Sequence, residues 1–429
     1  MNQTLNTVKY NLSLFICLAL MLPMVSCNVN SINQDKPEPF ERHTLPRELS
    51  ANEVQVANGS GDFGFNLMHK LLEANPDQSH VVSPLSIAMA YGMAMNGAEG
   101  ETYTQMQKVF GLGGMSRDQI SQSARELMEL LTQFDDKVRF NIANSIWYRD
   151  TFHVEDAFIE TNRRYYDAEI RATDFDDPEA VEKINEWVDS KTGGLIEEIV
   201  QGPIDPMTVM YLINAIYFNG TWTVEFDPRK TEKKPFYLAD GRKVETEMMR
   251  MDRKENILYG RGENYQAVNL YYGDAGFAMT LVLPDEEVGL ENWLTDTNWK
   301  KWQNLTGSLS GATVSLEMPK FEMEYEVEEF KKILQELGIT DAFGAGSADF
   351  SRINPSRNDL HISDTRHKTF IRVDEKGTEA AAVTSIEVSL TSVSQAIEIH
   401  FNRPFFYMIR EVESGTPLFM GTIADPSSL

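Results

Sequence analysis

The sequence predicts an α+β fold in one large domain. Apolar residues at helical spacing dominate the first half of the chain, and runs typical of strands dominate the second half. This segregation indicates α+β rather than alternating βα units. The chain has 429 residues, of which 42% are hydrophobic, which is ample for a large core. No linker rich in Pro, Ser or Gly divides residues 60–429, so we predict a single domain over residues 51–429.

Helices are predicted where apolar residues recur every three to four positions. Such stripes occupy residues 63–72, 85–93, 120–131 and 181–188. Ser83 and Pro84 give the second stripe a cap followed by proline at the first helical position. Asp177 and Pro178 repeat this start signal before the fourth stripe, and Gly193 predicts where that helix ends.

Strands are predicted from runs rich in β-branched and aromatic residues. These runs are residues 209–218, 277–283, 314–318, 397–401 and 405–409. The run 209–218 (VMYLINAIYF) is almost continuously apolar, which is typical of a central strand that is covered on both faces.

Residues 1–26 are predicted to be a signal peptide of the lipoprotein type. Lys9 precedes an apolar run at 12–24, which has signal-peptide length and is too short for a stable bilayer span. Val25-Ser26-Cys27 resembles a bacterial lipobox, in which the cysteine is lipidated, although Met24 stands where leucine is usual. The alternative is plain secretory cleavage in which Cys27 has no role.

Cys17, the only other cysteine, lies in the segment that would be removed, so the mature chain would hold no disulfide. Residues 27–50, with three prolines, predict a flexible tether. We therefore expect an exported protein that is lipid-anchored through Cys27 to a bacterial membrane, at the outer membrane or cell surface, and otherwise secreted.

Charge and motifs exclude several function classes. A formal net charge of −26 argues against nucleic-acid binding, which needs a basic surface. The sequence has no HExxH, no paired CxxC, no GxSxG and no phosphate-binding loop, and its histidines have no metal-ligand spacing. We therefore predict no metal, no cofactor and no enzymatic activity. A hydrolytic dyad of His367 with Ser83 or Ser86 is less favoured than a buried hydrogen-bonding cluster, because Ser83 is predicted to cap a helix.

Residues 374–404 carry the most information about function. Gly377 follows a polar stop and precedes the small residues 378–382, and a β-rich tract continues to Val393. At period two, one face of this segment is free of charge, and both glutamates, Glu379 and Glu387, fall on the other face. The uncharged face comprises Thr378, Ala380, Ala382, Thr384, Ile386, Val388 and Leu390. A segment with the pattern of a strand and the boundaries of a loop predicts two conformational states.

This segment resembles the reactive loop of serpins, a family of serine protease inhibitors. Further blocks resemble that family in the same order over residues 50–426, among them VVSPLSIAMAYGMAMNGA, NSIWYRD, LINAIYFNGTW, MPKFEMEYE, FNRPFFYMI and PLFMGTIADP. The resemblance implies helices packed around a large mixed central β-sheet plus smaller sheets, with an exposed reactive loop at about 375–397. It also implies roles for particular residues. The family's hinge matches Glu375, Gly377, Thr378, Glu379, Ala380, Ala381 and Ala382; its polar "shutter" matches Ser83, Ser86, Asn214 and His367; and its "breach" aromatic matches Trp222.

The resemblance implies a monomer that acts as a suicide substrate. The target protease attacks the loop and forms an acyl-enzyme, and the loop then inserts into the central sheet from Thr378 onward and traps the protease in a covalent acyl complex. Counting forward from Gly377 places the reactive bond at Thr391–Ser392, whereas counting back from Asn402 suggests Val393. Leu390 is a further alternate.

No Arg or Lys lies between Gly377 and His400, which disfavours trypsin-like targets. We expect elastase-, chymotrypsin- or subtilisin-like serine proteases, or papain-like cysteine proteases. The alternatives are a non-inhibitory serpin-fold binding or chaperone protein, and, more remotely, a lipid-anchored hydrolase that uses His367.

Overall fold

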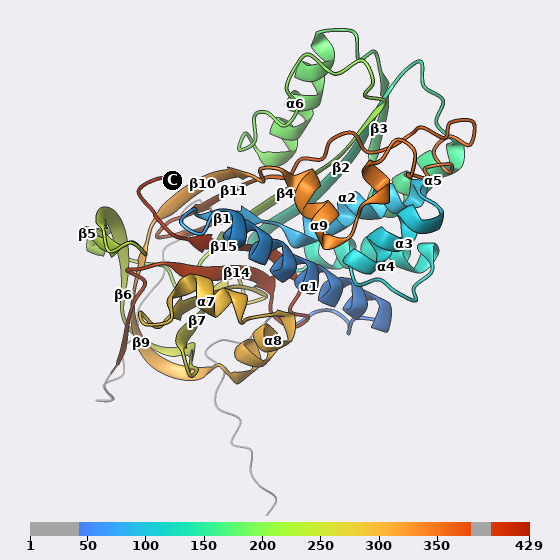
Figure 1. The fold of residues 1–429 in the computed structure, drawn as a ribbon. Helices are drawn as coiled ribbons and strands as arrows, with labels where there is room; N and C mark the ends of the chain where they lie inside the picture. Colours follow the sequence, from blue (N-terminus) through green and yellow to red (C-terminus); the bar gives the residue numbers. More distant parts are fainter. Residues whose placement is uncertain (1–42, 379–395) are drawn as a thin grey trace, which may run out of the picture. The chain divides into compact units, whose positions relative to one another are not determined.

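A computed structural model describes residues 43–378 and 396–429 and contains two β-sheets (Figure 1). The nine-stranded sheet comprises β1 (His80–Val82), β5 (Glu232–Tyr237), β6 (Lys243–Arg261), β7 (Tyr265–Tyr272), β8 (Phe277–Pro284), β9 (Ser310–Pro319), β13 (Ile397–His400), β14 (Phe405–Glu411) and β15 (Pro417–Ile423). Its order is β1-β15-β14-β8-β7-β6-β9-β13, with β5 paired to β6. All its pairs are antiparallel except β13 with β9.

The second sheet has six strands. It comprises β2 (Val138–Arg149), β3 (Glu169–Thr173), β4 (Met210–Thr221), β10 (Phe321–Glu326), β11 (Lys368–Val373) and β12 (Gly377–Thr378). Its order is β10-β11-β12-β4-β2-β3, in which β2 and β3 are parallel and the other pairs are antiparallel.

Helices pack against these sheets. They are α1 (Ala51–Ala74), α2 (Pro84–Gly97), α3 (Gly100–Val109), α4 (Arg117–Thr132), α5 (Asp156–Tyr166), α6 (Glu179–Thr192), α7 (Gly289–Thr295), α8 (Trp299–Ser308) and α9 (Phe330–Leu337), with 3-10 turns η1 (Pro228–Lys230) and η2 (Asp341–Phe343). The predicted α+β class is confirmed. Among the described residues, no helix has the length and apolar character needed to cross a bilayer.

Two predicted helix boundaries agree with the structure, the start of α2 at Ser83 and the end of α6 at Gly193. Ser83 caps α2, and its side chain accepts a hydrogen bond from the backbone N–H of Ser86. Gly193 ends α6 in the left-handed conformation, with φ of +68°. The start of α6 differs slightly from the prediction, because Pro178 occupies the cap position and Asp177 accepts from the backbone N–H of Glu179.

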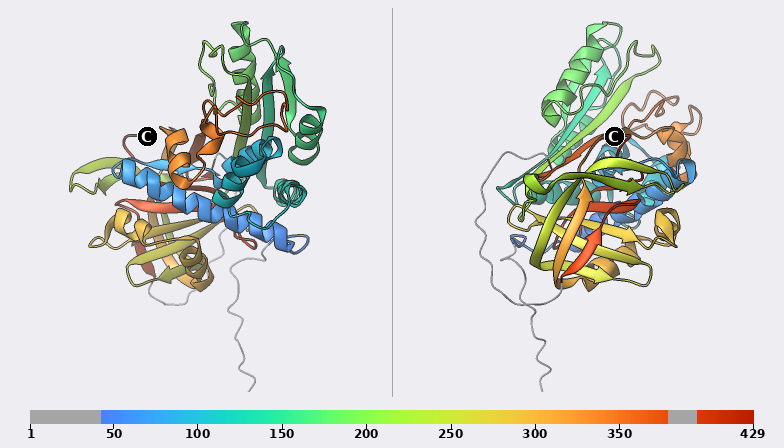
Figure 2. Two further views of the ribbon diagram at one scale, coloured as in Figure 1. Left: turned by 45° about the vertical axis from the view of Figure 1, so that its right-hand side comes forward. Right: turned by 90° about the vertical axis from the view of Figure 1, so that its left-hand side faces the viewer.

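Strand β4 lies in the interior of the six-stranded sheet and is covered on both faces, as its continuous apolar pattern predicts. Ile216 and Phe218 face the main core on the side of α2, whereas Ile213 and Ala215 face a smaller core that includes Trp187 of α6. The helices α2 and α6, which contact β4, can be followed by their colours in Figure 2.

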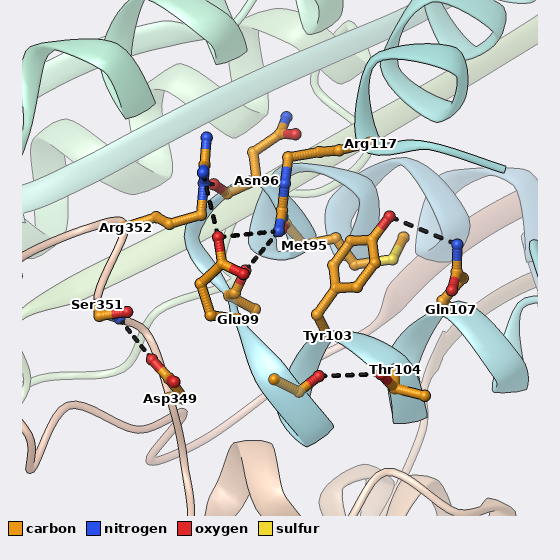
Figure 3. Close-up of polar contacts among 12 residues, drawn as sticks. Met95, Asn96, Glu99, Tyr103, Thr104, Gln107, Arg117, Asp349, Ser351 and Arg352 are labelled. Atoms are coloured by element: carbon orange, nitrogen blue, oxygen red, sulfur yellow. Dashed lines mark hydrogen bonds and ion pairs between the residues drawn. The ribbon is translucent and has the colours of Figure 1, made fainter.

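The C-terminal end of α2 is held by two arginines from distant segments (Figure 3). Arg117 Nη2 donates to the carbonyl oxygen of Ala98 at 2.8 Å, and Arg352 Nε donates to that of Asn96 at 3.2 Å. Glu99 lies 3.1 Å from Arg352 and 3.5 Å from Arg117 and balances part of their charge. The last carbonyl groups of a helix have no partner within the helix, so these contacts fix the end of α2 opposite to Ser83.

The end of the predicted tether is bound to the domain. His43 N–H donates to the carbonyl oxygen of Asp274 at 3.0 Å, and Leu45 N–H donates to Glu413 Oε2 at 2.8 Å. The Leu45 side chain is buried among apolar residues, and this contact with distant segments is not visible in a local pattern rich in proline. Residues 1–42, which include Cys27 and the predicted leader, lie outside the described residues.

Candidate functional site

The two-residue strand β12 lies between β4 and β11. Thr378 pairs with Gly220 of β4 on one side and with Val373 of β11 on the other, and Gly377 pairs with Thr221. Among the described residues, Thr378 is the last residue of the hinge that pairs with β4 and β11. Thr378, the first residue of the segment predicted to insert after cleavage, therefore already lies in the sheet of the uncleaved chain.

The side chain of Thr378 occupies a buried site that has room for a small, uncharged group. It is 3% exposed, and its Oγ1 lies 2.7 Å from the hydroxyl of Tyr272. Burial raises the pKa of Tyr272 well above its usual value, so this hydroxyl is neutral. Trp222 stacks on the Tyr272 ring with centroids 4.3 Å apart. Thr378, the first residue of the predicted uncharged face, is therefore buried, as is Gly377 before it.

Gly377 is required by the close approach of two backbones. A Cβ atom at this position would lie 2.1 Å from the carbonyl oxygen of Gly220, which is far inside van der Waals contact. Any other residue would push β12 away from β4.

Glu375 and Trp222 hold the turn that leads into β12. Glu375 accepts hydrogen bonds from Thr231 at 2.7 Å and from Lys320 at 3.2 Å. Burial alone would raise the pKa of Glu375, but these donors outweigh burial and lower it, so the carboxylate stays ionised. Trp222 donates from its backbone N–H to the carbonyl of Lys376 and from Nε1 to that of Asp374. The resemblance suggested Glu375 and Trp222, but it did not suggest Thr231, Lys320 or Tyr272.

The predicted shutter residues come together beside β4. The backbone N–H of Ser83 donates to His367 Nε2 at 3.0 Å, and the Ser83 hydroxyl donates to the carbonyl oxygen of Leu418 at 2.7 Å. The Ser86 hydroxyl donates to Asn214 Oδ1. Neither hydroxyl is bonded to His367, so the pair that a hydrolytic dyad needs is not formed here.

Sequence reasoning missed Asn144 of β2, which extends this cluster. Asn144 lies opposite Asn214 in the β2–β4 register, and its Oδ1 accepts from Asn214 Nδ2 at 2.6 Å. Asn144 Nδ2 donates in turn to the carbonyl oxygen of Tyr166 at 2.7 Å. The available signal was a polar residue within a strand that is otherwise largely buried.

His367 is neutral in this fold. A backbone N–H can only donate, so Nε2 of His367 must accept from Ser83, and the ring proton resides on Nδ1. Burial lowers the pKa of His367 to about 3. The unfolded chain therefore binds a proton at this histidine near pH 6.5, whereas the folded chain does so only near pH 3.

We expect this difference to reduce stability in acid. The penalty is absent above about pH 6.5 and grows by up to about 1.4 kcal/mol per pH unit as the pH falls toward 3. Urea unfolding from pH 7 to 4 should show a shallower loss of stability in His367→Gln than in the wild type. The control His153→Gln alters a histidine whose side chain is 71% exposed and should follow the wild type. Identical slopes for His367→Gln and wild type would contradict a neutral buried His367.

Below β12 the space between β4 and β11 contains a cavity of about 200 Å³. Its walls come from the first residues of β4, from α2, and from the segments 199–209 and 357–368. Ser86, Asn214 and His367 form a polar corner of this cavity. In residues 43–378 and 396–429, no group of three or more His, Cys, Asp or Glu side chains is placed to hold a metal ion.

Several predicted site residues lie outside the described residues. These are Cys27, Glu379, Ala380, Ala381, Ala382, Leu390, Thr391, Ser392 and Val393. The chain re-enters the described part at β13, which pairs with β9 through Ile397 and Val314. The strands on either side of this segment, β12 and β13, thus belong to different sheets.

Comparisons with known proteins agree with this geometry. The family model described as "Serpin (serine protease inhibitor)" matches residues 58–426. Human alpha-1-antichymotrypsin is 32% identical over 97% of this chain and 98% of its own. The native structure of tengpin, a thermophilic serpin, is 30% identical with a TM-score of 0.78, covering 91% of this chain and 98% of that one. Human thyroxine-binding globulin in complex with its ligand is 26% identical with a TM-score of 0.79, covering 88% and 100%.

Proposed function

The chain belongs to the serpin family of serine protease inhibitors, and on that premise we propose that it is a suicide-substrate inhibitor. A target protease attacks a bond near Thr391–Ser392, with Leu390 and Val393 as alternates, and becomes covalently attached as an acyl-enzyme. The freed end of the loop then continues β12 as a full strand between β4 and β11. The attached protease is displaced before water can release it.

The position of β12 is the observation that carries this proposal. Extending the Thr378–Gly220 register downward brings Thr384 opposite Asn214 and Ile386 opposite Leu212. The even-numbered side chains from Thr378 onward then face the main core, which is the uncharged face of the segment. The polar residue Thr384 arrives at the polar corner of the shutter, where buried polar groups need partners.

The energy of this step is sufficient. Each new ladder hydrogen bond contributes about 1 kcal/mol net, so a strand that extends from residue 380 to residue 390 supplies on the order of 10 kcal/mol. Loss of one oxyanion-hole donor costs a protease about 3–4 kcal/mol of transition-state stabilisation. Insertion can therefore offset the distortion needed to stop deacylation.

A protease panel tests the proposal. Elastase, chymotrypsin, subtilisin and papain should include at least one enzyme that forms a complex stable in SDS, and trypsin should not. After cleavage the melting temperature should rise strongly, because the inserted strand adds buried area and ladder hydrogen bonds. Mass spectrometry of the released C-terminal fragment should place the cut within residues 389–394. Cleavage without a covalent complex and without a rise in melting temperature would refute the proposal.

That negative result is what a non-inhibitory binding protein would give. The structural likeness to thyroxine-binding globulin supports this second candidate. The hinge favours inhibition, because small residues at 378 and 380–382 can enter the sheet, and bulky or charged residues could not.

We further propose that the protein acts as a monomer and is held at a membrane by lipid on Cys27. Cys27→Ser should move the protein from the membrane fraction to the soluble fraction of the producing cell and abolish labelling by a radioactive fatty acid. The control Cys17→Ser, in the segment that would be removed, should leave the protein in the membrane fraction. Membrane association of Cys27→Ser equal to that of the wild type would contradict lipidation.

A further inference from the structure

The cavity below β12 has the size and lining of a small-molecule site. Its volume of about 200 Å³ exceeds the ~150 Å³ of an apolar protein cavity that is known to take up benzene. The rings of two tyrosines and two phenylalanines line it together with several aliphatic side chains. They include Tyr91, Phe330, Phe350, Leu212, Ile353 and Leu360.

One polar group in this wall has a free hydrogen-bonding position. His367 is 6% exposed, its Nε2 accepts from Ser83, and Nδ1 therefore carries a proton. Among the described residues, Nδ1 has no hydrogen-bond acceptor. The other polar side chains of this corner, Ser86 and Asn214, are bonded to each other, and Asn214 also donates to Asn144.

The charges at the rim of the cavity are paired with each other. Arg357 donates to Asp359 at 2.7 Å, and Arg366 donates to Asp364 at 3.0 Å. Lys368 forms an ion pair with Glu324. A charged ligand would find these rim charges already matched, so a neutral one fits better.

We propose that this cavity binds a small neutral molecule with an aromatic or branched apolar body and one hydrogen-bond acceptor. The body lies among the rings of Tyr91, Phe330 and Phe350, and the acceptor receives the Nδ1–H of His367. The site occupies the part of the gap where the proposed function places Ile386 opposite Leu212. A bound ligand and the inserted strand would therefore exclude each other at this place. This consequence rests on the proposed function, but the binding of the ligand does not.

Two probes of similar shape test the site on the intact, uncleaved protein. Acetophenone has a phenyl ring and a carbonyl acceptor, and ethylbenzene has the ring without the acceptor. Isothermal titration at pH 7 should show saturable binding of one acetophenone per chain. Ethylbenzene should bind about fivefold more weakly, because it lacks one hydrogen bond. Absence of saturable acetophenone binding, or equal affinity for the two probes, would overturn the proposal.

Variants of α2 locate the binding. Ala90 and Ala94 both line the cavity, so Ala90→Phe and Ala94→Leu should each weaken acetophenone binding at least tenfold. Ala88→Leu adds a side chain on the same helix outside this cavity and should keep the wild-type affinity. Wild-type affinity in both cavity variants would overturn the assignment. The comparison of the two probes uses the wild-type protein, so it remains valid even if a variant does not fold. No protease is present in these titrations, so a failure to bind would not count against the proposed protease inhibition.

Discussion

Thr378→Arg should convert the protein from an inhibitor into a substrate of its target protease. The Thr378 side chain sits against the neutral hydroxyl of Tyr272, and no acidic partner is among its hydrogen-bond contacts. Burying an unpaired guanidinium there would cost several kcal/mol, so β12 would leave the gap and insertion would lack its starting point.

The measurement is a titration of protease against inhibitor, followed by a denaturing gel. We expect the covalent complex to fall at least tenfold while cleavage of the loop continues. Glu379→Arg is the matched control, since it introduces the same side chain one position later, on the face that already carries charge. The control should retain complex formation. An SDS-stable complex of wild-type yield in Thr378→Arg would show that insertion does not begin at this residue.

Ile386→Asp should have the second largest effect and act later in the same process. The register from β12 places Ile386 opposite Leu212, in the apolar cavity, so aspartate there loses the burial of an isoleucine and brings an unpaired charge into the core. The penalty is on the order of 4 kcal/mol or more. The cleaved variant should therefore melt well below the cleaved wild type, and less covalent complex should form.

Glu387→Asp is the control for this variant. It keeps a carboxylate one residue after Ile386, on the face of the inserted strand that already carries charge, and should melt after cleavage close to the wild type. The uncleaved forms of all three proteins should melt alike, since the proposed mechanism buries these side chains only after cleavage. Equal melting temperatures for the two cleaved variants would mean that the register inferred from Thr378 does not continue to Ile386.

Local signals predicted the parts of the fold that depend on neighbouring residues. The cap at Ser83, the end of α6 at Gly193 and the buried strand β4 all follow from short stretches of sequence. The long strand β6 was missed, because its residues are largely polar and its pairing with β9 is irregular between Met251 and Ile257. Arg253 and Asn256 have positive φ there, which interrupts the alternation that a strand prediction needs.

The residues of the candidate site also divide into those that a local pattern predicted and those that depend on distant contacts. The period-two pattern predicted an uncharged face that begins at Thr378, and the side chain of Thr378 is buried. The shutter residues were grouped by family resemblance rather than by any local pattern. Early pairing of Gly377 and Thr378 was not predicted, because it depends on Tyr272 and Gly220, which lie far from the hinge in sequence. The same holds for Lys320, whose contact with Glu375 exists only in the folded chain.

The order β1-β15-β14-β8 has a consequence for the molecule after cleavage. Strands β14 and β15 lie inside the nine-stranded sheet, and residues 405–409 are fully buried. A cut anywhere between residues 379 and 395 would therefore leave two polypeptides interlocked in a single fold. The shorter polypeptide should co-migrate with the longer one through a sizing column and separate only in denaturant. Two separately produced fragments divided at this point are candidates for spontaneous reconstitution.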